Sequence, residues 1–207
     1  MIIKLAQFIV LAAKNITFMF HLKLYNIHIN IMNYNSLPFD SVVIEILNNS
    51  NINFNILHNK IVFNTNYEYL STYKQNIDLK GCFELFDSLT STLYFLDSKQ
   101  LCISYVSMDD IIILNNQFLF INSKKIFQKI NNSILINKPY NKDDITLPID
   151  LKKNNRLPVI LDFEKGIFFS IGKLLDIIFN ENALNIDTPL KCIIEDCLNG
   201  NFQNILV

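Results

Sequence analysis

The chain has 207 residues, 50% of them hydrophobic, so it can bury one sizeable core that is divided at most between a large and a small lobe. Its formal charge of −1 and its single arginine, Arg156, argue against direct binding of nucleic acid, because phosphate contacts need clustered lysine and arginine. Asparagine, isoleucine, lysine and phenylalanine are abundant, which is typical of AT-rich codons. We therefore interpret the asparagine clusters as polar loops and not as a motif.

The chain begins with MIIKLAQFIVLAAK, in which an apolar run follows Lys4. The run is similar to a secretory signal only superficially, because it is short and is interrupted by Lys14 and Asn15. No stretch reaches the roughly 18 uninterrupted apolar residues of a membrane span. We expect a buried or poorly ordered leader and no membrane contact.

The segment from 16 to 70 has the pattern of β-strands. Apolar and polar residues alternate from 27 to 31, as in a strand that is half-buried on one face. Residues 54–63 and 66–70 predict further strands joined by asparagine-rich turns. Residues 41–50 are compatible with a short helix or a strand, because their β-branched residues leave both open.

After residue 80 the pattern becomes mainly helical. Leucines recur at three- and four-residue steps between 85 and 96, which predicts a helix with one apolar face. Two short strands, 111–114 and 118–121, should follow and pair with each other. Residues 128–158 are polar and contain three prolines, so we expect an extended loop there.

Two helices are predicted at the C-terminal end. Residues 166–179 are apolar nearly all round, which is typical of a helix buried on every side, and they should form the most buried element. The last helix should begin at Thr188 as its N-cap, with Pro189 in the first turn, and end at Gly200.

The cysteines and histidines do not form a recognisable site. No two cysteines make a C-x-x-C pair and each lies among apolar residues, which indicates reduced, buried thiols without a disulfide framework or zinc site. We interpret the three histidines as structural or solvent-facing residues. The cysteine usage favours an intracellular, cytoplasmic protein. The four cysteines are Cys82, Cys102, Cys192 and Cys197.

The most informative stretch, residues 93–127, reads LYFLDSKQLCISYVSMDDIIILNNQFLFINSKKIF and resembles the catalytic core of eukaryotic protein kinases. In that family a helix ending L-x-Y-L-H-S-K leads into a short strand, the loop H-R-D-L-K-P-E-N-I-L-L and a strand ending in D-F-G. Residues 93–99 match the helix end and 111–114 match the strand after the loop. The resemblance implies an α+β, protein-kinase-like fold with a reduced N-terminal β-lobe and a helical C-terminal lobe.

The functional letters of the kinase pattern are absent from this stretch. The loop His falls on Ile103, the Arg on Ser104, the catalytic Asp on Tyr105, the metal-binding Asn on Asp110 and the D-F-G Asp on Asn122. A phenol, which ionises near pH ~10, cannot act as the base, and an amide lacks the charge that holds magnesium. For Asp110 we weigh a metal ligand against a capped turn and favour the turn. The resemblance thus implies no catalytic residue and no metal site.

The resemblance also implies how a nucleotide would be bound, and the necessary residues are missing. A kinase covers ATP with a glycine-rich loop G-x-G-x-x-G before the catalytic segment. All four glycines of this chain come after residue 80, and no strand like V-A-I-K stands out before residue 70. ATP is the one cofactor that the resemblance suggests, and the missing loop argues against it, so we expect no cofactor.

One kinase-like family matches further. The regulatory pseudokinase subunit of the poly(A)-nuclease deadenylation complex has patterns similar to residues 96–113, 125–130, 168–178 and 188–198. The similarity covers about residues 80–207 and implies a protein partner, namely a deadenylase nuclease subunit, and a role in shortening poly(A) on mRNA without direct contact to nucleic acid.

We therefore predict three regions and one function. Residues 1–33 are a leader with first strands, 34–75 the remnant of a small β-rich lobe, and 76–207 a helical kinase-like lobe that is truncated at its end. The predicted function is a catalytically inactive interaction scaffold. Two alternatives remain open: a divergent active Ser/Thr protein kinase, and an unrelated structural protein of an AT-rich parasite or virus.

Overall fold

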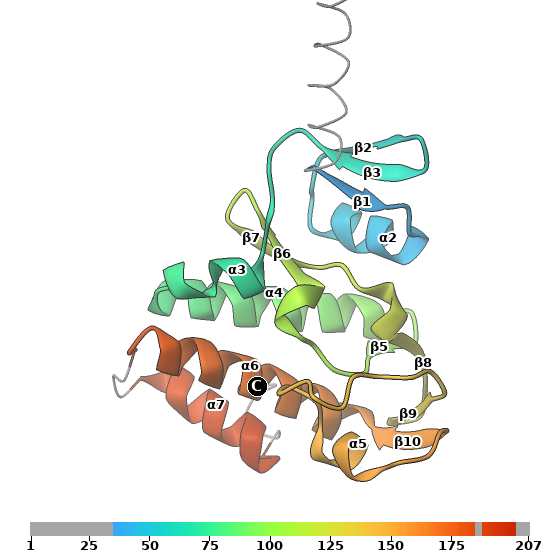
Figure 1. Ribbon diagram of the computed structural model, residues 1–207, viewed down its shortest axis with the longest axis vertical. Helices are drawn as coiled ribbons and strands as arrows, with labels where there is room; N and C mark the ends of the chain where they lie inside the picture. Colours follow the sequence, from blue (N-terminus) through green and yellow to red (C-terminus); the bar gives the residue numbers. More distant parts are fainter. Residues whose placement is uncertain (1–34, 185–187, 202–207) are drawn as a thin grey trace, which may run out of the picture. The chain divides into compact units, whose positions relative to one another are not determined.

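The computed structural model describes residues 35–184 and 188–201 (Figure 1). The leader and the strand predicted at 27–31 lie outside the described residues. The described residues divide into two compact units, one that contains 35–38 with Phe54–Asn66 and one that contains Phe39–Asn53 with 67–184 and 188–201. We describe each unit by itself.

The first unit contains a three-stranded antiparallel sheet in the order β1-β3-β2. Its strands are β1 (Ser36–Pro38), β2 (Phe54–Leu57) and β3 (Lys60–Phe63). His58 and Asn59 both have positive φ, 49° and 59°, which is the backbone that a two-residue hairpin turn requires. The strand content predicted for 54–63 is confirmed, and the turn divides it into a hairpin.

The second unit begins with a helix, α2 (Ser41–Asn49), at a segment whose sequence left helix and strand open. Asp40 is its N-cap, and its carboxylate accepts hydrogen bonds from the backbone N–H groups of Val42 at 3.0 Å and Val43 at 3.2 Å. An aspartate cap satisfies N–H groups that the first helical turn leaves free, and it therefore favours the helix.

The strand predicted at 66–70 is mostly wrong. Only β4 (Glu68–Tyr69) is extended, and the chain continues into α3 (Leu70–Tyr73) and a 3-10 turn, η1 (Lys74–Asn76). The predicted helix after residue 80 is confirmed as α4 (Leu79–Asp97). The leucines of its predicted apolar face are all buried: Leu85, Leu89, Leu93 and Leu96.

The hairpin predicted after α4 is confirmed. Strands β6 (Ile111–Leu114) and β7 (Gln117–Phe120) pair antiparallel, with β7 beginning one residue earlier than predicted. Asn115 and Asn116 turn the chain with φ of 50° and 62°, so these asparagines have a conformational role. With β4 at the other edge of β6, the three strands form a sheet in the order β4-β6-β7.

The extended loop predicted for 128–158 is wrong in part. Part of this segment belongs to a four-stranded antiparallel sheet, in the order β10-β9-β8-β5: it contains the end of β8 and the whole of β9. A short helix, α5 (Ile149–Lys153), also lies within the segment. The alternation of buried Ile134 and Ile136 with exposed Leu135 is the strand signal that the polar neighbours concealed. The strands are β5 (Leu101–Ile103), β8 (Ile126–Ile130), β9 (Ser133–Ile136) and β10 (Val159–Asp162).

The predicted C-terminal helices are confirmed as α6 (Phe163–Glu181) and α7 (Pro189–Asn199). Figure 1 shows α6 between α4 and α7, and α6 has more buried residues than any other described helix. Gly200 ends α7 with a positive φ of 78°. Thr188 occupies the N-cap position, but its side chain makes no capping hydrogen bond.

One expectation about the cysteines needs correction. All four are free, and Cys82, Cys102 and Cys197 are buried as predicted, but Cys192 is exposed on α7. Burial raises the pKa of Cys82 to about 11 and that of Cys102 and Cys197 to about 12. In the described part of the chain, no helix has the length and apolar character needed to span a membrane.

Candidate functional site

The segment that matches the kinase loop connects β5 to β6 and is held against α6. The hydroxyl of Ser170 accepts a hydrogen bond from the N–H of Val106 at 2.7 Å and donates one to the carbonyl of Val106 at 2.8 Å. Both residues are buried, so one side chain satisfies both backbone groups of the loop. The loop is thus fixed at its centre to the most buried helix.

The three residues at the H-R-D positions are all buried. Ile103 ends β5 and belongs to the hydrophobic core, and Ser104 donates its N–H to the carbonyl of Lys125 at 2.9 Å. Burial, followed by the charges of Asp144 and Asp110, raises the pKa of Tyr105. The phenol therefore stays protonated at neutral pH and cannot accept a proton from a substrate.

Asp110 forms the capped turn that the sequence favoured. A 3-10 turn, η2 (Met108–Asp110), begins with a capping box: Ser107 is the N-cap, and Asp110 Oδ2 accepts its N–H at 2.7 Å. Oδ1 accepts from Asn122 Nδ2 at 2.7 Å, and Oδ2 also accepts from Lys125 Nζ at 2.6 Å. The structure thus brings together Asp110 and Asn122, and both carboxylate oxygens already have hydrogen-bond donors.

Lys125 is the central residue of the site, and the sequence interpretation missed it. Its ammonium lies 2.6 Å from Asp110 Oδ2 and 3.9 Å from Asp144 Oδ2, donates to Ser107 Oγ, and lies 3.7 Å from the centre of the Tyr105 ring. We call Ser107, Asp110, Asn122, Lys125 and Asp144 the lysine cluster. The available signals were the position of Lys125 directly after 122–124 and the charged run around Asp144.

The lysine cluster is a nearly closed ionic network. The side chains of Lys125, Asp110 and Asp144 are 15%, 5% and 14% exposed. Burial raises the pKa of Asp144, but hydrogen bonds from Ser107 and Thr146 and the charge of Lys125 together lower it below its usual value. Among the residues that the structure describes, no group of three or more metal-binding side chains lies together. The network fixes the positions of these side chains, and the carboxylates of Asp110 and Asp144 already accept hydrogen bonds from protein donors.

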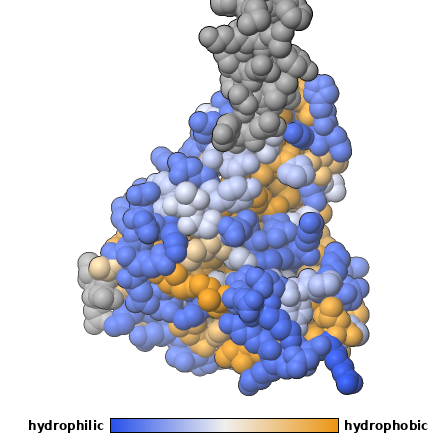
Figure 2. Space-filling view, viewed as in Figure 1, coloured by the Kyte–Doolittle hydropathy of each residue, from blue (hydrophilic) through white to orange (hydrophobic). Residues whose placement is uncertain are grey.

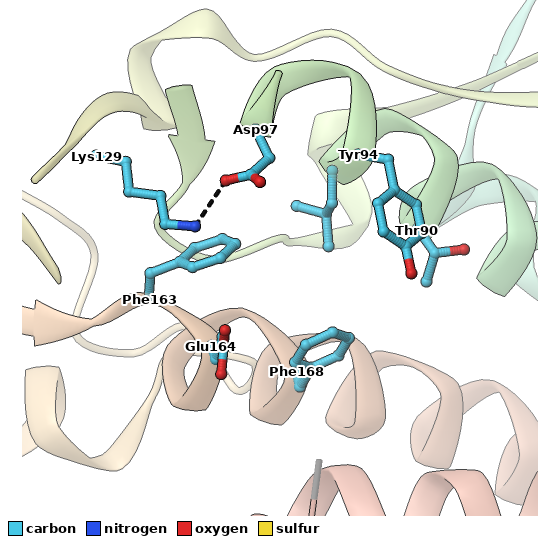
Figure 3. A pocket seen from close by; sticks show the side chains of 8 residues that line it. Thr90, Tyr94, Asp97, Lys129, Phe163, Glu164 and Phe168 are labelled. Atoms are coloured by element: carbon cyan, nitrogen blue, oxygen red, sulfur yellow. Dashed lines mark hydrogen bonds and ion pairs between the residues drawn. The ribbon is translucent and has the colours of Figure 1, made fainter. Parts of the chain in front are cut away.

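Two pockets flank this part of the molecule. One, of about 410 Å³, lies beside the lysine cluster and includes Tyr105, Phe127 and Tyr140 in its wall. The other, of about 100 Å³, lies between α4 and α6 (Figure 3). In the second pocket Lys129 Nζ lies 2.6 Å from Asp97 Oδ1 and 4.6 Å from the centre of the Phe163 ring, so its one lysine is already paired.

The arrangement of helices and antiparallel sheets defines an α+β protein. Comparison with models of protein families finds no match, and comparison with curated proteins finds none.

Proposed function

We propose that the protein is a catalytically inactive, protein-kinase-like interaction scaffold. The observation that carries the proposal is the position of Lys125, whose ammonium contacts Asp110, the residue at the metal-ligand position of the kinase pattern. Transfer of a phosphoryl group needs metal ions, a base and a lysine on the phosphates. At this site a lysine takes the place next to the carboxylate where a metal would bind.

The order of elements supports the kinase-like part of the proposal. A long helix (α4) is followed by a short strand (β5), a loop and a hairpin (β6 and β7), as the resemblance implies, and a buried helix (α6) comes later, after β8, β9, α5 and β10. Strands β5 and β8 also pair, which brings the loop and the segment after 122–124 to the same place. The lysine cluster forms where these two segments meet.

The surface supports the scaffold part. Figure 2 shows exposed apolar residues in the region where β9 and β10 lie. Ile160 on β10 and Leu135 on β9 are register partners, so they lie on the same face of the sheet, and both are exposed. Contiguous exposed apolar surface is one feature of sites that bind other proteins, and these two neighbouring side chains contribute to such a surface. Partner binding is a use that a fold retains when its catalytic charges are absent.

The specific form of the proposal is a cytoplasmic regulatory subunit in poly(A) shortening, with a deadenylase nuclease subunit as its partner. The formal charge of −1 and the single arginine support an indirect role at RNA, through that partner. No cofactor is part of this proposal.

Affinity purification from cells that express the tagged full chain, followed by mass spectrometry, tests the partner. The matched bait is the double variant Leu135→Lys/Ile160→Lys, which puts charge on the apolar sheet face and leaves the lysine cluster unchanged. We expect a deadenylase nuclease subunit with the wild-type chain and its loss with the variant. A wild-type bait that repeatedly recovers no protein above the tag-only control contradicts the scaffold and favours a structural protein.

A further inference from the structure

The pocket beside the lysine cluster has the size and walls of a small-ligand site. Its volume of about 410 Å³ lies within the ~300–1,000 Å³ range of ligand pockets. Tyr105, Phe127 and Tyr140 supply aromatic surface, and the buried side chain of Ile136 adds an aliphatic contact. Such walls favour a flat, apolar group, because rings stack on aromatic faces and bury apolar area there.

The charged residues around this pocket are all basic. Lys124, Lys125 and Lys138 line it, and no acidic residue is among its lining residues, all of which belong to the described part of the chain. Lys125 is ion-paired with Asp110 and Asp144. Lys124 and Lys138 are exposed, and neither forms an ion pair with another described residue.

Lys138 connects the charge to the aromatic wall. Its ammonium lies 5.5 Å from the centre of the Phe127 ring, within the reach of a cation–π contact. A ring that stacks against Phe127 would therefore place a substituent near an ammonium that has no ion-pair partner among the described residues. A phosphate carries a charge of about −1.5 to −2 at pH 7, which the two unpaired lysines neutralise, whereas a carboxylate neutralises only one of them.

We propose that this pocket binds an aryl phosphate, with the ring against Phe127 and Tyr140 and the phosphate between Lys124 and Lys138. The proposal goes beyond the scaffold function and does not depend on the identity of a protein partner. The aryl phosphate has two sources, a phosphorylated tyrosine side chain or a free small molecule, and the chemistry that the pocket recognises is the same for both.

Titration of the full chain with phenyl phosphate, followed by isothermal calorimetry or ligand-observed NMR, tests the proposal. A fragment of this size should bind with a Kd of about 1 mM. Benzoate lacks the second charge and inorganic phosphate lacks the ring, so each should bind at least about tenfold more weakly. A second titration uses N-acetyl-phosphotyrosine amide. If the natural ligand is a phosphorylated tyrosine side chain, this compound should bind more tightly than phenyl phosphate. If the natural ligand is a free small molecule, it should bind no more tightly.

The matched variants separate the pocket from general charge. Lys124→Gln/Lys138→Gln should weaken phenyl phosphate at least about tenfold, because both anion contacts are lost. Lys153→Gln/Lys165→Gln removes the same charge at two exposed lysines outside the pocket and should leave Kd within about twofold. The proposal is overturned by absence of saturable binding, by equal binding of inorganic phosphate, or by equal losses in the two double variants. A folded chain, checked by circular dichroism, is required for each variant.

Discussion

Lys125 Nζ lies 2.6 Å from Asp110 Oδ2, and both side chains are largely buried. The two residues are fifteen positions apart: Asp110 precedes the β6–β7 hairpin in the chain, and Lys125 follows it. Removing one partner of a buried ion pair of this kind destabilises the protein, because the remaining carboxylate stays charged in a poorly solvating environment. The pair therefore stabilises the loop, and it supplies Asp110 Oδ2 with a charged hydrogen-bond donor.

Lys125→Met should destabilise the protein by about 3 kcal/mol, since it removes the ammonium from a buried carboxylate and keeps most of the side-chain volume. Lys124→Met is the matched control, because Lys124 is exposed. This substitution should change the free energy of unfolding by less than about 0.5 kcal/mol. Urea unfolding at pH 7 measures both. Equal effects would show that the pair does not contribute to stability.

Ser170→Ala should destabilise the protein by about 2 kcal/mol. The substitution leaves the N–H and the carbonyl of Val106 without their buried partner, and each unsatisfied group costs about 1–3 kcal/mol before relaxation or entry of water. Ser91→Ala, at an exposed position of α4, is the control and should have almost no effect. Hydrogen exchange at the amide of Val106 should also become faster in Ser170→Ala; an unchanged rate would contradict the anchoring role.

Gly172→Ala should destabilise the contact of α6 with α7. A Cβ at residue 172 would lie 2.5 Å from Cys197 Cβ and 3.3 Å from the carbonyl oxygen of Ile194, so the helices must move apart. We expect a net loss of about 2 kcal/mol, because overpacking exceeds the gain of about 1 kcal/mol in helix propensity. Thermal denaturation measures this loss of stability, and Glu195→Ala, at an exposed position of α7, is the control. A higher melting temperature for Gly172→Ala would refute the close packing.

The pH dependence of stability should reveal Asp144. Its pKa is lowered in the folded protein and returns to about 3.9 in the unfolded chain, so the unfolded state binds more protons in acid. The stability from the ionised carboxylate is therefore present at pH 7 and is lost as the pH falls through the folded-state pKa. Asp144→Asn should be destabilised at pH 7, and its difference from wild type should shrink below about pH 4.

The neighbouring carboxylate gives the control for this experiment. Asp143 is exposed, and Asp143→Asn should follow the wild-type pH profile closely. Unfolding in urea at a series of pH values between 3 and 7 measures all three proteins. A difference between Asp144→Asn and wild type that stays constant over this range would contradict the role of the ionised carboxylate.

The elements that the sequence predicted are those with strong local signals. The two short apolar strands predicted at 111–114 and 118–121, the apolar helix at 166–179, and Gly200 as a helix end all depend on residues close in the chain. The β8–β9 hairpin was missed because polar residues surround Ile134 and Ile136 and the prolines nearby suggested a loop.

The site was predictable only in part. Aligned motifs singled out Asp110 and Asn122, which do meet in the structure. The position of Lys125 directly after 122–124 and the charged run around Asp144 mark both residues, but they do not predict that the two meet. An ion pair between residues nineteen positions apart depends on the path of the intervening chain. A charge in a polar run has the same local pattern whether it faces solvent or a buried partner.

A phosphotransfer assay with the purified full chain, labelled ATP, magnesium and generic protein substrates tests the central claim most directly. The account predicts no transfer above the protein-free background, because Tyr105 stays protonated and Lys125 contacts the one carboxylate at the metal position. Magnesium-dependent transfer by the wild-type chain that disappears in Asp110→Ala would contradict it and establish a divergent active kinase.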